Sequence, residues 1–194
     1  MPIIVGARPD HARQYRAWDT LPGRAEGDRV QAIEAEPIGT ERFVIEPLTV
    51  EHAPAMAAVL ADPALYAYTG GTAPQVAELR ERYARWVAGS GEPGTAWCNW
   101  VLRDRASGEL VGWLQATVSG RAAAELAWVV GSARQGQGVA KEAARALAGW
   151  LRGQGVALLV AHVHPGHAAS AAVAAAAGLR PTGRLVDGEV RWEG

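Results

Sequence analysis

The alternation of apolar and polar positions along the chain predicts a series of strands and amphipathic helices. Phe43 and Ile45 alternate with Val44 and Glu46, a pattern typical of a strand with one buried face. Apolar residues between positions 72 and 89 recur at the spacing of a helix with one buried face. The predicted elements are a strand over 42–48, helices over 49–61 and 72–89, strands over 96–103, 109–118 and 122–130, a helix over 138–152, a strand over 157–164, a helix over 167–177 and two short strands on either side of Asp187-Gly188.

The order of these elements predicts the fold class. Short turn-forming segments separate the three strands between residues 96 and 130, so these strands are expected to be antiparallel neighbours. The later strand, helix, strand order implies a parallel pair joined by a right-handed crossover. We therefore predict one α+β domain with a mixed sheet over residues 40–194. Residues 1–39 show no sustained period and are predicted to be an N-terminal extension of unknown role.

Composition narrows the classes of function. The 194 residues, 49% of them apolar, suffice for one well-formed core. The formal charge of −1 gives no field that would attract nucleic acid or an anionic membrane. Cys98 is the one cysteine, which excludes an internal disulfide and a zinc site built from cysteines and favours a reducing, cytoplasmic location. No apolar run is long enough for a signal peptide or a membrane span.

The most informative segment joins a predicted strand to a helix through the glycine-rich turn Gln135-Gly136-Gln137-Gly138. The first N–H groups of a helix lack partners within it and lie at the positive end of its dipole, so such a turn can bind a phosphate group. Two interpretations stay open: a pyrophosphate site, or only a tight turn. The sequence argues against a dinucleotide site, because Lys141 stands where that fingerprint needs a third glycine, and it contains no Gly-Lys-Ser/Thr for a P-loop.

Gln135, Gly138 and Ala140 form a Gln-x-x-Gly-x-Ala pattern that resembles the acetyl-CoA signature of the GNAT N-acetyltransferase superfamily. The resemblance extends over about residues 40–193, because the element order also matches. Its other motifs are Ala124-Glu125-Leu126-Ala127-Trp128 in the fourth strand, Val163-x-Pro165-x-His167-x-x-Ser170 across the fifth strand and the next helix, and Gly178-Leu179. Within the superfamily, the chain is most similar to the branch that includes the acetyltransferases of ribosomal-protein N-termini.

The resemblance implies the GNAT fold, a mixed and mostly antiparallel sheet whose parallel fourth and fifth strands splay apart and are flanked by helices. It implies acetyl-CoA as co-substrate, with the pantetheine arm along the fourth strand and the pyrophosphate at the glycine-rich turn, and no metal. A backbone N–H near Val130 would stabilise the oxyanion. The cofactor-binding residues that it implies are Trp128, Val129, Val130, Gln135, Gly136, Gln137, Gly138, Val139, Ala140, His167 and Ser170.

Glu125 and Ser170 are the candidate catalytic residues. Glu125 lies close to where some members of the superfamily carry a base and could deprotonate the amine through a water molecule; equally, it could pair with an arginine or orient the substrate. Strand alternation places it on the face of Ala127 and Val129. Many members use a tyrosine as the acid, but Ala174 stands there, so Ser170 is the remaining hydroxyl, either as a hydrogen-bond donor to sulfur or as a helix cap.

Three histidines, His162, His164 and His167, form a His-x-His-x-x-His pattern. His162 and His164 are expected to share a strand face, which leaves a transition-metal site open, although we favour the interpretation that these histidines line the groove between the splayed strands. The resemblance assigns the amine acceptor to another set of residues. That set is Tyr66, Tyr68, Thr69, Gly70, the helix from Thr72, and Gln115.

These features predict an N-acetyltransferase that transfers the acetyl group of acetyl-CoA to a primary amine, on a small molecule or a protein N-terminus, by direct attack in a ternary complex. The alternative is a GNAT-fold module that binds acetyl-CoA as a sensor or scaffold, because the usual tyrosine is missing and His167 replaces the usual asparagine. The expected partners are acetyl-CoA and an amine acceptor, without nucleic acid or membrane. The sequence decides neither the amine nor whether the chain forms a homodimer.

Overall fold

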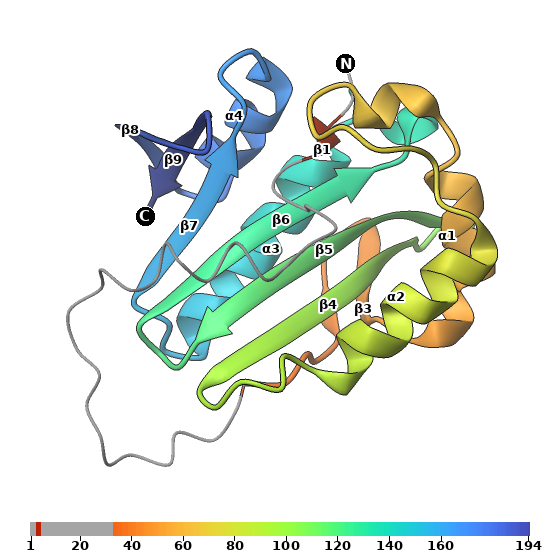
Figure 1. Cartoon of the computed structure of the whole chain (residues 1–194), viewed down its shortest axis with the longest axis horizontal. Coiled ribbons are helices and arrows are strands. Elements are labelled where there is room, and N and C mark those ends of the chain that lie inside the picture. Colours follow the sequence, from red (N-terminus) through yellow and green to blue (C-terminus); the bar gives the residue numbers. More distant parts are fainter. Residues whose placement is uncertain (1–2, 5–32) are drawn as a thin grey trace.

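The computed structural model describes residues 3–4 and 33–194 and shows a twisted sheet flanked by helices (Figure 1). Its strands are β1 (Ile3–Ile4), β2 (Ile38–Gly39), β3 (Phe43–Pro47), β4 (Thr95–Asp104), β5 (Leu110–Ser119), β6 (Ala123–Val130), β7 (Leu158–Val163), β8 (Arg180–Val186) and β9 (Glu189–Glu193). Its helices are α1 (Ala53–Val59), α2 (Val76–Ala88), α3 (Val139–Gly153) and α4 (Ala168–Ala176), with short 3-10 helices η2 (Val50–His52), η3 (Pro63–Tyr66) and η4 (Ser132–Arg134). Every predicted strand and helix is present, which confirms the α+β class; the sequence pattern does not predict β1 or β2.

The strands form one nine-stranded sheet in the order β2-β3-β4-β5-β6-β7-β9-β8, with β1 added beside β6. Neighbours from β2 to β6 are antiparallel, β6 and β7 are parallel, and β7, β9 and β8 are again antiparallel. The connection from β6 to β7 runs through α3. The sheet is therefore mixed and mostly antiparallel, as predicted, and β6 and β7 are the predicted fourth and fifth strands.

The parallel strands β6 and β7 are neighbours over only part of their length. Ala123 to Glu125 of β6 lie opposite Leu158 to Val160 of β7, and beyond Glu125 the two strands diverge (Figure 1). The rest of β6 consequently has an edge that β7 does not cover. On this edge β1 pairs antiparallel with β6, with Ile3 opposite Val130 and Ile4 opposite Val129.

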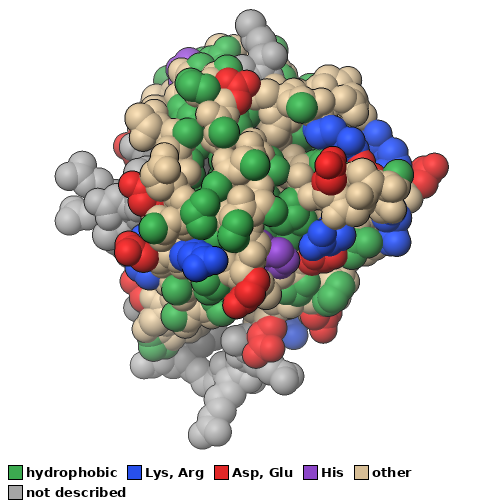
Figure 2. Space-filling model, turned by 90° about the vertical axis from the view of Figure 1, so that its right-hand side faces the viewer, with side chains coloured by type: hydrophobic (Ala, Val, Ile, Leu, Met, Phe, Trp, Pro, Cys, Tyr) green, Lys and Arg blue, Asp and Glu red, His purple; other side chains and the backbone are tan. Residues whose placement is uncertain are grey.

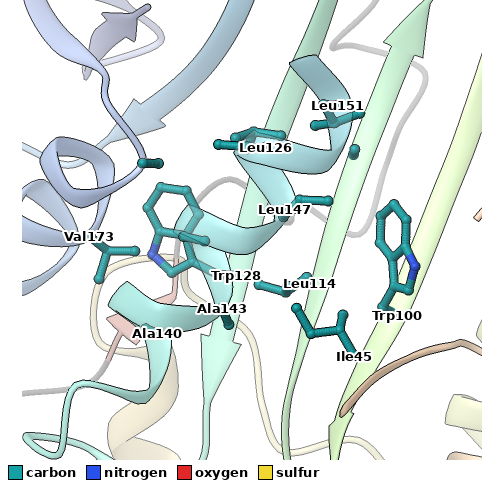
Figure 3. Packing of buried hydrophobic residues seen from close by; sticks show 14 of the residues in the cluster. Ile45, Trp100, Leu114, Leu126, Trp128, Ala140, Ala143, Leu147, Leu151 and Val173 are labelled. Atoms are coloured by element: carbon teal, nitrogen blue, oxygen red, sulfur yellow. The ribbon is translucent and has the colours of Figure 1, made fainter. Parts of the chain in front are cut away.

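Helices cover the two faces of the sheet and enclose two apolar clusters. In the larger cluster, Leu126 and Trp128 of β6 pack toward α3, whose Leu147 is fully buried, and Val173 of α4 lies beside the Trp128 indole (Figure 3). Because side chains alternate along β6, Ala127 and Val129 point to the face opposite Leu126 and Trp128 and belong to the second cluster. That second cluster joins α1, α2 and the sheet through Met56, Leu79, Tyr83, Trp86, Val101, Trp113, Ala127 and Val129.

The segment before β2 contributes to the larger core. Ile33 and Ile38 are buried there, and the indole Nε1 of Trp100 donates a hydrogen bond of 2.8 Å to the carbonyl of Glu36. Cys98 is buried against the same segment, and burial raises the pKa of its thiol to about 12. The division of the chain after residue 39 stays a prediction, and most of the predicted extension, residues 1–2 and 5–32, lies outside the described residues.

Candidate active site

The glycine-rich turn between β6 and α3 has the backbone geometry that its sequence requires. Gly136 and Gly138 have φ values of 73° and 77°, the left-handed region that glycine adopts without strain. A Cβ atom at Gly136 would meet nothing within 4 Å, so the space beside this backbone is open. The side-chain Nε2 of Gln135 donates a hydrogen bond of 2.9 Å to the carbonyl of Val130, which fixes the turn against the end of β6.

An ion pair holds the start of α3 to the strand on the other side of the core. Nε of Arg42 lies 2.7 Å from a carboxylate oxygen of Glu142, and Nη1 of Arg42 donates to the carbonyl of Gln137 at 3.0 Å. Glu142 is partly desolvated, yet hydrogen bonds from Thr40 and Arg42 hold the pKa of its carboxyl below the usual range. The guanidinium of Arg42 is thus neutralised by Glu142, and it is the unpaired amides of the first turn of α3 that are suited to an anionic group.

The edge of β6 that diverges from β7 presents backbone groups to β1. The amide of Gly131 donates to the carbonyl of Val111 in β5, at 2.9 Å. Because successive residues of a strand turn their backbone groups to opposite sides, the N–H of Val130 points away from β5, toward the edge on which Ile3 of β1 lies opposite Val130. This is the direction in which the predicted oxyanion contact requires it.

Trp128, Ser170 and His167 meet beneath this edge, on the α4 side of the sheet. The indole Nε1 of Trp128 donates to the hydroxyl of Ser170 at 3.3 Å, which leaves the hydroxyl hydrogen of Ser170 able to donate elsewhere. Nδ1 of His167 accepts from the amide of Ser170 at 3.4 Å and caps α4. The His167 ring stacks on Tyr68, with ring centroids 4.2 Å apart.

Two of the three histidines of the His-x-His-x-x-His pattern, His164 and His167, both pack against the ring of Tyr68, whereas His162 contacts Glu125. His164 lies beyond the end of β7, where its Nδ1 accepts from the amide of Gly166 at 3.1 Å, whereas His162 is on β7 and faces the acceptor side. His167 caps α4. Within residues 3–4 and 33–194, no group of three or more histidine, cysteine, aspartate or glutamate side chains is arranged to hold a metal ion.

Glu125 is bonded to a histidine on the neighbouring strand. Oε1 of Glu125 lies 2.9 Å from Nδ1 of His162, and the two side chains are only 14% and 9% exposed. Glu125 stands at the last position where β6 pairs with β7, so the pair lies where the strands begin to diverge. The sequence places both residues in the groove region, but it does not reveal this contact, because the register of a parallel pair is not written in either strand alone.

Buried polar side chains gather on the face that carries Glu125. Asn99, Gln115 and Ala127 lie opposite one another on β4, β5 and β6, and Ala127 belongs to the cluster under α1 and α2. Both polar atoms of the Asn99 amide and Nε2 of Gln115 are buried without a hydrogen-bond partner among the described residues. The Tyr83 hydroxyl from α2 shares this condition, and its burial raises the pKa of the phenol.

Such unpaired groups are costly, at about 1–3 kcal/mol each, and are uncommon in folded proteins. A water molecule or a bound polar group between these side chains would supply the missing hydrogen bonds. The resemblance to the family predicts Gln115 on the acceptor side. It does not predict Asn99 or Tyr83, because nothing in the sequence distinguishes Asn99 from other strand residues or Tyr83 from other residues of an amphipathic helix.

The predicted acceptor loop reaches both faces. The hydroxyl of Tyr66 donates to the carbonyl of Leu60 at 2.9 Å, which ties the loop to the end of α1. The hydroxyl of Tyr68 donates to the carbonyl of Gly166 at 3.3 Å, which ties it to the segment after β7. Tyr68 therefore connects the loop with His167 on the cofactor side.

The outer surface of α2 carries no single sign of charge. Its exposed side chains include Glu78, Arg80, Glu81 and Arg85, and Arg82 is half-buried. On the side of the molecule shown in Figure 2, acidic and basic side chains lie next to one another and among apolar ones. In the part of the chain that the structure describes, no helix is long and apolar enough to cross a membrane.

The splayed parallel pair, with a glycine-rich turn leading into the crossover helix, defines the fold of acyl-CoA-dependent N-acyltransferases. A family model described as Acetyltransferase (GNAT) domain matches residues 42–180, more than half of the chain. The chain therefore belongs to the GNAT acetyltransferase family, and acetyl-CoA is its co-substrate. A sequence comparison with curated proteins gave no match.

Solved structures share the fold at low sequence identity. RimL, a ribosomal alpha-N-protein acetyltransferase in complex with coenzyme A, is 18% identical with a TM-score of 0.68, covering 82% of this chain and 97% of that chain. An acetyltransferase from Agrobacterium tumefaciens is 24% identical with a TM-score of 0.62, covering 87% and 99%. A GNAT-family acetyltransferase from Bacillus anthracis is 18% identical with a TM-score of 0.66, covering 81% and 96%. At sequence identities of 18% to 24%, the structural similarity shows the fold alone, and this is the GNAT fold that the sequence predicts.

Proposed function

We propose that this protein transfers the acetyl group of acetyl-CoA to the primary amine of a small molecule or a protein N-terminus, by direct attack in a ternary complex. One observation carries the proposal. β6 has a backbone edge that β7 leaves uncovered and that only the two-residue strand β1 pairs with among the described residues, and a glycine-rich turn at its end, while one of its faces carries the Glu125–His162 pair where β7 turns away. The two reactants can thus approach one strand from different directions and meet beside Val130.

The residues of the cofactor side fit acetyl-CoA. The amides from Gln135 to Ala140 would bind the pyrophosphate, because two left-handed glycines leave the backbone uncovered there. Trp128, Val129 and Val130 would line the pantetheine arm, and His167 and Ser170 would lie beneath it. Of these residues, Ser170 has a hydroxyl hydrogen that can be donated to the sulfur.

The reaction requires the amine to lose a proton before it attacks. Glu125 is the carboxylate of the acceptor face and supports that loss. The nitrogen then attacks the thioester carbon, the N–H of Val130 stabilises the oxyanion, and the carbon–sulfur bond breaks. Ser170 donates a hydrogen bond to the departing thiolate, a role for which many relatives use a tyrosine that Ala174 replaces here.

The pairing of β1 has a direct consequence for this proposal. Ile3 and Ile4 lie opposite Val130 and Val129, the residues proposed for the pantetheine arm. Backbone groups on one strand edge cannot pair with two partners at once. The N-terminal strand and acetyl-CoA therefore compete for the edge of β6.

Calorimetric titration of acetyl-CoA into the full-length protein tests the cofactor site. We expect micromolar binding by the wild type and a loss of about 100-fold in Gly136→Glu, because a carboxylate would face the pyrophosphate at short range. Gly136→Asn tolerates the left-handed backbone without the charge and should bind nearly as well. Gly149→Glu adds the same charge on an exposed position of α3, where a Cβ meets nothing within 4 Å, and serves as the control.

The acceptor is tested by incubating the wild type with acetyl-CoA and a panel of primary amines, including polyamines, aminoglycosides, amino acids and N-terminal peptides. Mass spectrometry should detect an acetylated amine together with stoichiometric release of CoA. Binding of acetyl-CoA without acetylation of any amine would contradict the proposed activity.

A further inference from the structure

We infer that Nε2 of His162 receives the proton of the attacking amine and that Glu125 acts as a positioning residue behind it. This inference rests on the proposed N-acetyltransferase activity and refines the role of Glu125 within it. Three features of the pair support this role: the contact between the two side chains, the unbonded second nitrogen of the imidazole, and the groups that surround it.

The contact with Glu125 selects one tautomer of His162. An ionised carboxylate can only accept hydrogen bonds, so the 2.9 Å contact requires the hydrogen of the neutral imidazole to lie on Nδ1. Nε2 is then left with a lone pair and no hydrogen. The same relation between a carboxylate and a histidine orients the base in hydrolases that use a catalytic triad.

The second nitrogen of His162 has no hydrogen-bond partner in the described part of the chain. The His162 side chain is 9% exposed, and its Nε2 atom is buried and unbonded. A buried acceptor without a donor costs stability. A bound substrate that donates a hydrogen bond to Nε2, as an ammonium group does, would remove that cost.

The position of His162 brings Nε2 to the acceptor face. Glu125 lies opposite Val160 in the parallel pair, so His162, two residues farther along β7, belongs to the same face of the sheet. On that face β6 continues with Ala127, whose small side chain stands beside Gln115 and Asn99 in the strand register. The unpaired amide groups of these two residues and the lone pair of His162 thus lie on the same face of the sheet, with His162 on β7 just past the last position where β6 and β7 pair.

The charges around His162 favour a cationic acceptor. Glu125 approaches from β6, and Arg191 and Glu193 lie opposite His162 and Val160 on β9. Arg191 is paired with Glu193 at 2.5 Å, while Asn99 and Gln115 are neutral. With a neutral imidazole the group carries a net charge of −1, which favours an alkylammonium and offsets the charge of the imidazolium that forms.

The unpaired amides specify the rest of the acceptor. The Asn99 side chain offers both donors and an acceptor, and Gln115 offers a donor. An uncharged group of the acceptor that both donates and accepts hydrogen bonds, such as a hydroxyl or an amide next to the amine, would pair with these side-chain amides. The site is therefore expected to prefer amino alcohols or peptide N-termini to plain alkylamines.

His162 and Ser170 together account for the protons that move in the reaction. The ammonium gives one proton to Nε2 of His162, and the free amine forms the new carbon–nitrogen bond. As the carbon–sulfur bond breaks, the electron pair leaves with sulfur, and the nitrogen's second proton passes to the thiolate, with Ser170 donating to the sulfur. The imidazolium releases its proton to solvent after the products leave.

The tautomer can be measured directly on the full-length protein labelled with nitrogen-15 in its histidines. Long-range proton–nitrogen spectra, assigned with the His162→Gln variant, should show a neutral His162 with its hydrogen on Nδ1 in the wild type. In Glu125→Ala the hydrogen bond that fixes this tautomer is absent, and the form with hydrogen on Nε2 should grow. A wild-type His162 with its hydrogen on Nε2 would overturn the inference.

Kinetics with two amines of similar size then separate a base from a merely structural residue. Propylamine is mostly protonated near neutral pH, whereas 2,2,2-trifluoroethylamine is a far weaker base and is mostly free. His162→Gln should lower kcat/KM for propylamine by about 100-fold or more, but for trifluoroethylamine by less than about 10-fold, because the second amine has already lost its proton. Equal losses for both amines would overturn the inference.

Two controls complete the design. His52→Gln removes an imidazole of η2 and should change neither rate by more than about twofold. Glu125→Gln should show the same split between the amines as His162→Gln, with a smaller loss. A wild type that binds no acetyl-CoA would instead contradict the proposed function, and the tautomer measurement would still decide the state of His162.

Discussion

The two sides of β6 are built in different ways. On the proposed cofactor side the binding groups are backbone amides from a contiguous stretch of chain, the end of β6 and the turn into α3. On the proposed acceptor side they are side chains from β4, β5, β6, β7 and α2, which the sheet brings together. A site made of backbone accepts the invariant part of a common co-substrate, whereas a site made of side chains can be altered residue by residue for a particular amine.

The largest effect should come from the core that holds α3 in place. Leu147 is fully buried between α3 and the sheet. Leu147→Ala should lower the free energy of unfolding by about 2–5 kcal/mol, because it removes buried methyl groups and leaves a cavity. Chemical denaturation of the full-length protein measures this change. A loss below about 1 kcal/mol would contradict the assignment of Leu147 to the core that holds α3 against the sheet.

On the acceptor side, by contrast, replacing a buried polar side chain should raise the free energy of unfolding. Asn99→Leu replaces a buried, unpaired amide with an apolar group of similar shape, so the free energy of unfolding should rise by about 1–2 kcal/mol. Acetylation of the amine should fall, while the Kd of acetyl-CoA stays the same. Asn99→Asp is the matched control and should destabilise the protein, because it buries a charge. Loss of stability in Asn99→Leu would show that the amide has a partner and is not kept for a ligand.

An ion pair on the acceptor side gives a smaller effect that depends on pH. Arg103 forms two hydrogen bonds with Glu46, of 2.7 and 2.9 Å, and these lower the pKa of the Glu46 carboxyl. A lowered pKa stabilises the fold above the ordinary value of 4.5, and this stability is lost as the pH falls through the folded pKa. Because both side chains are partly exposed, Glu46→Gln should cost about 0.5–1 kcal/mol at pH 7, and this cost should shrink as the pH falls through the folded pKa of Glu46. A cost that is independent of pH would contradict this assignment.

The smallest effect concerns β1. Ile3→Pro removes the backbone N–H that faces Val130 and should weaken the pairing of β1 with β6. The Kd of acetyl-CoA should then fall by about two- to threefold, since a competing occupant of the edge is less populated. Ile3→Val keeps the N–H and should bind as the wild type does. An unchanged Kd in Ile3→Pro would show that β1 and the co-substrate do not compete.

The sequence predicts the contiguous parts of the molecule well. The strand, turn and helix around Gly136 and Gly138 lie in one segment, so periodicity and glycine positions suffice to place them. The two-residue strands β1 and β2 are too short to show a period. The pairing of Glu125 with His162 depends on the register between parallel strands, and the row of Asn99 and Gln115 depends on a hairpin register, neither of which a single strand encodes.

The most direct test of the account is a titration of the nitrogen-15 labelled, full-length protein with acetyl-CoA, followed by amide proton–nitrogen spectra. The account predicts the largest shifts at the backbone amides of Val129, Val130 and residues 135–140, while the side-chain amides of Asn99 and Gln115 change little until an amine is added. Shifts centred on Asn99 and Gln115 with acetyl-CoA alone, or none at residues 135–140, would contradict the division of β6 into a cofactor side and an acceptor side.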